Sequence, residues 1–279
     1  ATLAARRAWC YLVLVFFSFL CLFFFYVLII NATRPHADIQ KGFSFLPGSW
    51  TSLCNNFTQV INNANIPILS GMRNSLIVSA MTAIFACYFS ALTAFGIHAY
   101  RFKGRALALT FILLIMTMPT QVSALGFVQL MGKMNLKDSL LPLFLPSIAS
   151  PAVFYFMHQY MQASLPLEVI EAARIDGSSE FGTFNRIVLP MIKPALAVQA
   201  IFTFVGAWNN YFTPALILNS ANKKTLPILI AQLRSADFLK FDMGQVYMMI
   251  ALSILPVIIV YLFLSKFIIA GVAVGGGKE

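Results

Sequence analysis

The sequence PLEVIEAARIDGSSEFGTFNRIVLPMIKP, residues 166–194, interrupts a chain that is otherwise almost continuously apolar. Pro166 is placed to open a helix, where its missing N–H costs nothing, and Glu168 in the first turn suits the positive end of the helix dipole. Gly177 stands where a left-handed helix C-terminus is expected, and either of the two serines after it can cap a second helix. The stretch therefore predicts two short helices joined by a glycine turn, too polar to lie in lipid and suited to contact another protein.

The second of these predicted helices has one apolar face. Four side chains recur on it at helical spacing: Phe181, Phe184, Ile187 and Val188. Glu180 falls in its first turn, where a negative charge is favourable. Pro190 is expected to close the helix, because proline removes a backbone donor and clashes with the preceding turn.

In its spacing this stretch resembles the EAA loop of ABC-importer permease subunits. The run Glu171-Ala172-Ala173 is followed after three residues by a glycine, and nine residues later by Ile187-x-Leu189-Pro190. The form Arg-Ile-Asp-Gly that ends at this glycine is similar to the carbohydrate-uptake branch. The resemblance implies a cytoplasmic coupling helix that docks in a groove on an ATP-binding subunit. The residues that would make this contact are Glu171, Ala172, Ala173, Asp176, Gly177, Ile187, Leu189 and Pro190.

Weaker matches extend the resemblance from residues 73–75 to the end of the chain. Residues 225–227, Thr-Leu-Pro, and the glycine-rich 271–278 look like the shorter permease of maltose-type importers. The tail departs from the branch's usual Thr-Ala-Gly-Ala ending, since 272–275 read Val-Ala-Val-Gly. By resemblance, the partners are a second, homologous permease, two ATP-binding subunits and an external solute-binding protein that delivers a sugar.

The composition predicts an integral membrane protein. The 279 residues are 59% hydrophobic and 10% charged, whereas ordinary globular chains are about 25% charged. The net charge of +10 is not arranged as a cationic stripe with exposed aromatic residues, so basic loops beside an anionic leaflet are expected and a nucleic-acid partner is not. The four cysteines and three histidines are widely spread, which indicates neither a disulfide framework nor a metal site.

Apolar runs divide the chain into six predicted spans in an all-α fold, taken as one permease domain, 1–279, in the bacterial inner membrane. About 20 residues suffice to cross the hydrocarbon core. The predicted spans are 8–30, 74–99, 106–131 with a kink at Pro119, 140–162, 195–218 and 245–270. Arginines before the first span and cations at 101–105 place both termini in the cytoplasm and make 31–69 and 219–244 external. Because 219–244 also carries Lys and Arg, this sidedness rests partly on the resemblance.

The chain has no sign of an energy source or catalytic site of its own. The phosphate-cradling GxxxxGK[ST] loop is absent, so no cofactor is expected in this chain, and ATP with Mg is assigned to partner subunits. A membrane-embedded enzyme is an alternative, but no catalytic constellation supports it. A secondary carrier for a small polar solute is another, yet the predicted spans lack the acidic residues that proton coupling commonly needs.

Polar residues at membrane depth are the remaining candidates: Trp208, Asn209, Asn210 and Tyr211, near the middle of the predicted fifth span. Amides and aromatic faces suit the hydroxyls and rings of sugars, but the same amides also suit hydrogen bonding between helices. The polar loop 219–244 is likewise open to two interpretations, a protrusion toward the solute-binding protein or a passive connector. The sequence as a whole predicts a six-span permease subunit of an ATP-driven importer for an oligosaccharide or related sugar.

Overall fold

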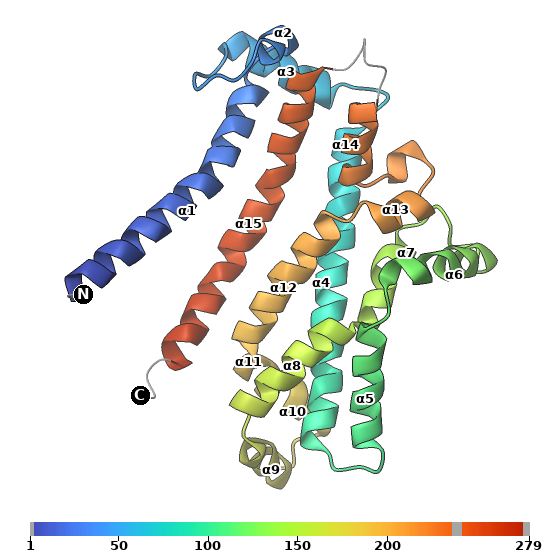
Figure 1. Ribbon diagram of the computed structural model, residues 1–279. Helices are drawn as coiled ribbons and strands as arrows, with labels where there is room; N and C mark the ends of the chain where they lie inside the picture. The colour runs from blue at the N-terminus through green and yellow to red at the C-terminus, as the bar shows by residue number, and fades with distance from the viewer. Residues whose placement is uncertain (1–2, 236–241, 276–279) are drawn as a thin grey trace. The chain divides into compact units, whose positions relative to one another are not determined.

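A computed structural model describes residues 3–235 and 242–275, and every regular element in these two ranges is a helix (Figure 1). The predicted all-α fold is therefore confirmed. In chain order the helices are α1 (Leu3–Ala32), α2 (His36–Gln40), α3 (Trp50–Ile61), α4 (Ile68–Ala99), α5 (Arg105–Met116), α6 (Thr120–Lys133), α7 (Leu141–Phe144), the 3₁₀-helix η1 (Leu145–Ala149), α8 (Pro151–Ser164), α9 (Leu167–Ile175), α10 (Glu180–Thr183), the π-helix η2 (Phe184–Val188), α11 (Leu189–Met191), α12 (Lys193–Trp208), α13 (Phe212–Ile217), the 3₁₀-helix η3 (Ala221–Lys223), α14 (Leu226–Ser235) and α15 (Met243–Gly275).

Four helical stretches of the described chain are long and apolar enough to cross a membrane. They are Ala5–Ala32, Ile68–Ala99, Leu141–Ser164 and Met243–Phe267. Two further stretches pass the same test as bent pairs, Arg105–Met116 with Gln121–Lys133 and Glu180–Met191 with Lys193–Trp208. The structure thus supports between four and six spans, and the upper count equals the predicted number. The second bent pair covers 180–208, however, whereas the predicted fifth span is 195–218.

The chain divides into two compact units, 1–69 with 229–255, and 70–228 with 256–279. In the first unit, α3 contacts the end of α1, and α2 contacts the start of α15. The Asn56 amide donates to the carbonyl oxygen of Ala32, the last residue of α1, at 2.9 Å, and to that of Arg34 just beyond it at 3.0 Å. The Met243 N–H donates to His36 Nδ1 at 3.0 Å.

The second unit has its core between α4, α8, η2 and the start of α12. Phe184 and Met157 are fully buried there, and small Ala91 and Ala94 on α4 allow close helix approach. The ring of Phe184 packs at 5.7 Å from Tyr88 and 5.6 Å from Phe95, centroid to centroid. This core fixes residues 166–194 to the end of α4.

The helices differ from the prediction in four places. The kink expected at Pro119 is a bend of 99° between α5 and α6. The predicted fifth span, 195–218, is not one helix, because α12 ends at Trp208 and α13 begins at Phe212. The predicted polar loop 219–244 contains α14, which buries Leu226, Leu229 and Leu233, while its residues 236–241 lie outside the described range. Helix α15 continues to Gly275, so part of the expected tail is helical, and 276–279 are likewise not described.

Candidate functional site

The turn between α9 and α10 is built by the glycine that the sequence singles out. Gly177 has φ +76°, a left-handed conformation that costs a residue with a Cβ atom about 1–2 kcal/mol. The Ser178 N–H donates to the Ala173 carbonyl at 3.0 Å, and the Gly177 N–H donates to the Arg174 carbonyl at 3.1 Å. These two bonds make a Schellman motif, which satisfies the last carbonyls of α9. The predicted glycine turn between two short helices is confirmed.

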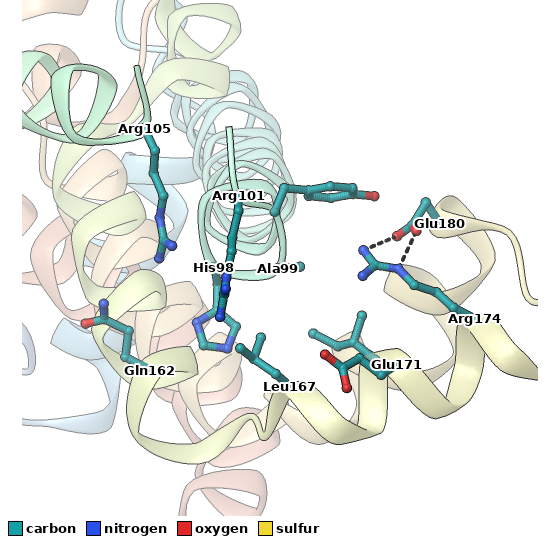
Figure 2. Close-up of a pocket in the computed structure, with 11 residues that line it drawn as sticks. His98, Ala99, Arg101, Arg105, Gln162, Leu167, Glu171, Arg174 and Glu180 are labelled. Carbon is teal, nitrogen blue, oxygen red and sulfur yellow. Dashed lines mark hydrogen bonds and ion pairs between the residues drawn. The ribbon is translucent and has the colours of Figure 1, made fainter. Parts of the chain in front are cut away.

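Side chains close this turn from both sides. Ser179 caps α10 by accepting from the Gly182 N–H at 3.1 Å. Arg174 Nε and Nη2 donate to the two carboxylate oxygens of Glu180 at 2.7 and 3.3 Å, and the Arg174 guanidinium lies 5.1 Å from the Tyr100 ring centroid (Figure 2). The last turn of α9 and the first turn of α10 are therefore held together before any partner binds.

Helix α9 has one face on the protein and one in solvent. Ile170 and Ala173 are buried, whereas Glu171 and Ala172 are exposed. Ile175 is 86% exposed, although it is a large apolar residue. Because residues three and four apart share a helix face, Ile175 lies on the same side as the exposed Glu171 and Ala172. This face of α9 is a small exposed surface with an apolar centre and an acidic edge.

The second helix is fastened to α4 through part of the predicted apolar stripe. Phe184 and Val188 are fully buried and Ile187 is half-buried, but Phe181 is 63% exposed, so the prediction that it joins this stripe is wrong. The Tyr88 hydroxyl on α4 donates to Asn185 Oδ1 at 3.1 Å.

Pro190 does not close the helix as predicted. It lies within α11, and the turn before it widens into η2, where the Leu189 N–H bonds to the Phe184 carbonyl five residues earlier. The helix ends at Met191, and the chain turns by 81° into α12. The missing donor of a proline is thus accommodated by a π-turn, a local irregularity that often marks functional sites.

Most of the predicted coupling residues are accessible. Glu171, Ala172, Asp176, Gly177 and Pro190 are exposed, Ile187 and Leu189 are half-buried, and Ala173 is buried. The structure therefore separates them into a solvent-facing group on α9 and its turn, and a group that packs inward. Ile175 and Phe181 were not predicted as contact residues. The sequence did hold a sign of them, because each is a large apolar residue next to the turn in an otherwise polar stretch.

The second candidate region lies at the break between α12 and α13. Trp208 is buried and its ring stacks on Phe204 with centroids 5.8 Å apart. Asn209, Asn210 and Tyr211 are exposed. Asn210 Oδ1 accepts from the Thr213 N–H at 3.3 Å, which satisfies one of the first donors of α13. The four predicted residues therefore point to different environments, and only Trp208 is part of the packed interior.

Three helix breaks meet at a cavity of about 940 Å³. Its walls come from the α5–α6 break, from the η1–α8 junction and from α13. The polar lining residues are Gln121, Ser123, Ser150, Asn210 and Thr213, and the remaining lining residues are apolar. Of the four residues predicted at 208–211, Asn210 alone lines this cavity. Amide and hydroxyl groups set among apolar side chains, with no charged lining residue in the described chain, suit a neutral polyhydroxy solute.

A polar clasp fixes the chain beyond α13. Asp138, itself at φ +56°, accepts at one carboxylate oxygen from the N–H groups of Asn219 and Ser220, both at 2.9 Å. Its other oxygen lies 3.2 Å from Lys223 Nζ. The Ser220 hydroxyl and these backbone donors hold the pKa of Asp138 well below its ordinary value. The clasp ties residues 219–223 to the chain after α6.

Comparisons with known proteins agree with the resemblance of the 166–194 loop. A family model described as binding-protein-dependent transport system inner membrane component matches residues 88–273. The arabinooligosaccharides transport system permease protein AraQ of Bacillus subtilis (strain 168) is 34% identical over 265 residues, covering 94% of this chain and 92% of that protein. The sn-glycerol-3-phosphate transport system permease protein UgpE of Yersinia pestis bv. Antiqua (strain Antiqua) is 28% identical over 265 residues, with 94% of each chain covered.

A solved structure shares the fold. It is the crystal structure of a bacterial ABC transporter involved in the import of the acidic polysaccharide alginate, one chain of which matches with a TM-score of 0.80. The match covers 95% of this chain and 98% of that chain at 20% sequence identity. The likeness therefore concerns the arrangement of helices, and it extends over nearly the whole molecule.

Proposed function

The chain belongs to the family of binding-protein-dependent transport system inner membrane components, and on this premise we propose that it forms half of the translocation pathway of an ATP-driven importer for a neutral oligosaccharide. Its partners in this proposal are a second permease, two ATP-binding subunits and an external solute-binding protein. ATP hydrolysis belongs to the ATP-binding subunits, with Mg bound there. The chain itself catalyses no reaction.

The observation that carries the proposal is the preformed α9 surface of the 166–194 loop. Its exposed Ile175 and Ala172 offer an apolar contact, and the Schellman turn with the Arg174–Glu180 pair holds it rigid. A short helix with one exposed apolar anchor is suited to a groove on a partner. In this account closure of the ATP-binding subunits moves α9, and the buried Phe184 transmits that movement to α4.

The solute path is assigned to the cavity at the three helix breaks. Asn210 offers donors and an acceptor to sugar hydroxyls, and Phe212 in the same lining offers an apolar ring face. No described residue that lines the cavity is charged, so the cavity favours a neutral sugar over a phosphorylated or acidic solute. A neutral sugar also agrees with the name of the similar arabinooligosaccharides permease. Trp208 supports this region from behind by packing, rather than by contact with the solute.

The sidedness of the chain follows from this assignment. The 166–194 loop and both termini lie in the cytoplasm, whereas 31–69 and 219–244 lie outside. A unique cysteine at position 179 should then react with an impermeant maleimide only after permeabilisation, and the native exposed Cys54 should react in intact cells. The reverse pattern would overturn the topology.

Reconstitution tests the function as a whole. The chain, co-expressed with its neighbouring permease, ATP-binding subunit and solute-binding protein, should take up a neutral oligosaccharide into proteoliposomes only when ATP is inside. A panel of neutral, phosphorylated and acidic sugars identifies the class of solute. Uptake by the purified chain alone, driven by an ion gradient, would show instead a secondary carrier.

A further inference from the structure

A second cavity, outside the proposed solute path, opens between the end of α4, the start of α5 and α9 (Figure 2). Its volume is about 810 Å³. Its polar lining residues are His98, Tyr100, Arg101, Arg105, Gln162, Glu171, Arg174 and Glu180. We propose that this cleft binds the phosphate group of an anionic phospholipid of the cytoplasmic leaflet.

Some charged side chains of the cleft have partners within the protein, and others have none among the described residues. Arg174 is paired with Glu180, and the His98 ring is held by the Leu165 carbonyl, 3.0 Å from Nε2. In the part of the chain that the structure describes, the side chains of Arg101 and Arg105 form neither a hydrogen bond nor an ion pair. Two guanidinium groups in one cleft present forked donors that match the oxygens of a phosphate.

The position of the cleft identifies the source of that phosphate. Arg105 begins α5, whose exposed Leu107, Phe111 and Leu114 form a stripe at i, i+4 and i+7 along one side of the helix. Residues two apart face nearly opposite sides of a helix, so this stripe lies on the side of α5 away from Arg105 and is free to face lipid. Arg105 lies at the end of the same helix, at the depth expected for the headgroups of the cytoplasmic leaflet. Basic pockets at the cytoplasmic ends of membrane helices bind anionic headgroups in this way.

The walls of the cleft also direct the anion. Glu171 lies on the α9 wall and repels a phosphate, so the anion is directed toward Arg101 and Arg105. Gln162, at the end of α8, lines the same cleft and can donate to a phosphate or accept from a headgroup hydroxyl. A bound lipid would therefore connect α5 and α8 beside the turn that carries α9. The inference rests on the proposed cytoplasmic side of 166–194, and not on the identity of the solute.

The test is lipid binding to the assembled transporter, in detergent, measured by native mass spectrometry. Phosphatidylglycerol should bind at least about tenfold more tightly than phosphatidylcholine, because both carry the phosphate but the choline of the second adds a cation that the two arginines repel. The double variant R101Q/R105Q should lose this preference. The matched control is Lys103→Gln, which removes a cation from the same loop at a residue that does not line the cleft, and it should keep the preference.

Three outcomes would overturn the proposal. Equal loss in Lys103→Gln would show a diffuse surface attraction and no built site. Glycerol 1-phosphate or inorganic phosphate binding as tightly as the lipid would show a site for a soluble anion. Wild-type complex with no preference for phosphatidylglycerol would show that the cleft is empty of lipid or covered by an ATP-binding subunit. If the double variant fails to assemble, Arg101→Lys and Arg105→Lys keep the charge and should each weaken binding without abolishing it.

Discussion

The chain is interrupted twice in ways that invite comparison, at Gly177 between α9 and α10 and at residues 209–211 between α12 and α13. At the first interruption the polar groups are satisfied within the loop. A left-handed glycine makes the turn, and two backbone hydrogen bonds, a serine cap and an ion pair complete it. In the second, the N–H groups of Asn209 and Asn210 bond to carbonyls of α12 and the Thr213 N–H bonds to Asn210, but the side-chain amides of both asparagines stay exposed, that of Asn210 in the lining of a cavity. The first is a rigid surface, and the second is a site that still has polar groups to offer.

Under the proposed function, the two breaks have different roles that account for this difference. A surface that transmits force needs one conformation, so its polar groups are satisfied within the loop. A path for a polar solute needs donors and acceptors that are free to exchange partners, which in a membrane protein occurs where irregular backbone lines a cavity. The predictions below separate these two kinds of break.

The largest effect is expected at Gly177. Replacement by Val imposes the positive-φ cost of about 1–2 kcal/mol, or about five- to thirtyfold in the population of the turn, and β-branching adds to it. No atom lies within 4 Å of a Cβ built there, so the defect is conformational and the helices around it stay packed. Sugar-stimulated ATP hydrolysis and uptake should be lost while the permease pair still assembles. Gly177→Asn is the control, because Asn tolerates the left-handed region and should retain most activity.

An intermediate effect is expected at the second break, and it should distinguish adjacent residues. Asn210→Ala removes a cavity-lining amide and a helix-capping acceptor, so uptake should fall about two- to tenfold, as for one lost hydrogen bond. Asn209→Ala removes an exposed amide that does not line the cavity and should leave uptake near wild type. Initial rates in proteoliposomes measure both. Equal effects of the two variants would remove the cavity from the solute path.

A pH-dependent effect is expected at Asp138. Its pKa is lowered by folding, so its stabilisation is present above the unfolded-state pKa of about 3.9 and is lost as the pH falls through the lower folded-state pKa. Asp138→Asn keeps a residue that tolerates φ +56° but removes the charge. The unfolding temperature of wild type should exceed that of the variant at pH 7, and the difference should shrink below about pH 4. A difference that grows in acid would contradict the clasp.

The smallest effect is expected at the Arg174–Glu180 pair. Both side chains are substantially exposed, with relative areas of 36% and 44%, so solvent screens their attraction. Glu180→Gln should change transport slightly, and the change should become smaller as salt is raised. Thermal unfolding and uptake in low and high salt measure this. A loss as large as that of Gly177→Val would mean that the ion pair, and not the glycine, sets the turn.

The first break was predictable from the sequence because its determinants are local. Proline at a helix start, glycine at a left-handed end and serine at a cap each act within a few residues. The second was missed, although a signal existed: Pro214 has no N–H and its ring clashes with the carbonyl of Asn210, four residues earlier. The apolar composition of 195–218 favoured a single continuous helix, because hydropathy indicates that a segment lies in the membrane but does not indicate where its helix breaks.

Other features depend on contacts distant in sequence. The clasp joins Asp138 to residues 219–223, about 80 positions later, and no periodicity encodes that pairing. The outward position of Phe181 was also not predictable, because its spacing fits the stripe of Phe184 and Val188 equally well. Which of these side chains is buried depends on which face of the helix packs against α4, and that is known only from the structure.

The most direct test of the central claim is cross-linking from α9 to the ATP-binding subunit. On a background without the four native cysteines, single cysteines at Ala172 and Ala173 are labelled with a photoactivatable maleimide in the assembled complex. Ala172 is exposed, whereas its neighbour Ala173 is 5% exposed and packs against the protein, so the pair is matched in size and position. The account predicts an adduct with the ATP-binding subunit from position 172 and none from position 173. A labelled 172 that yields no such adduct would contradict the assignment of this loop as the coupling surface.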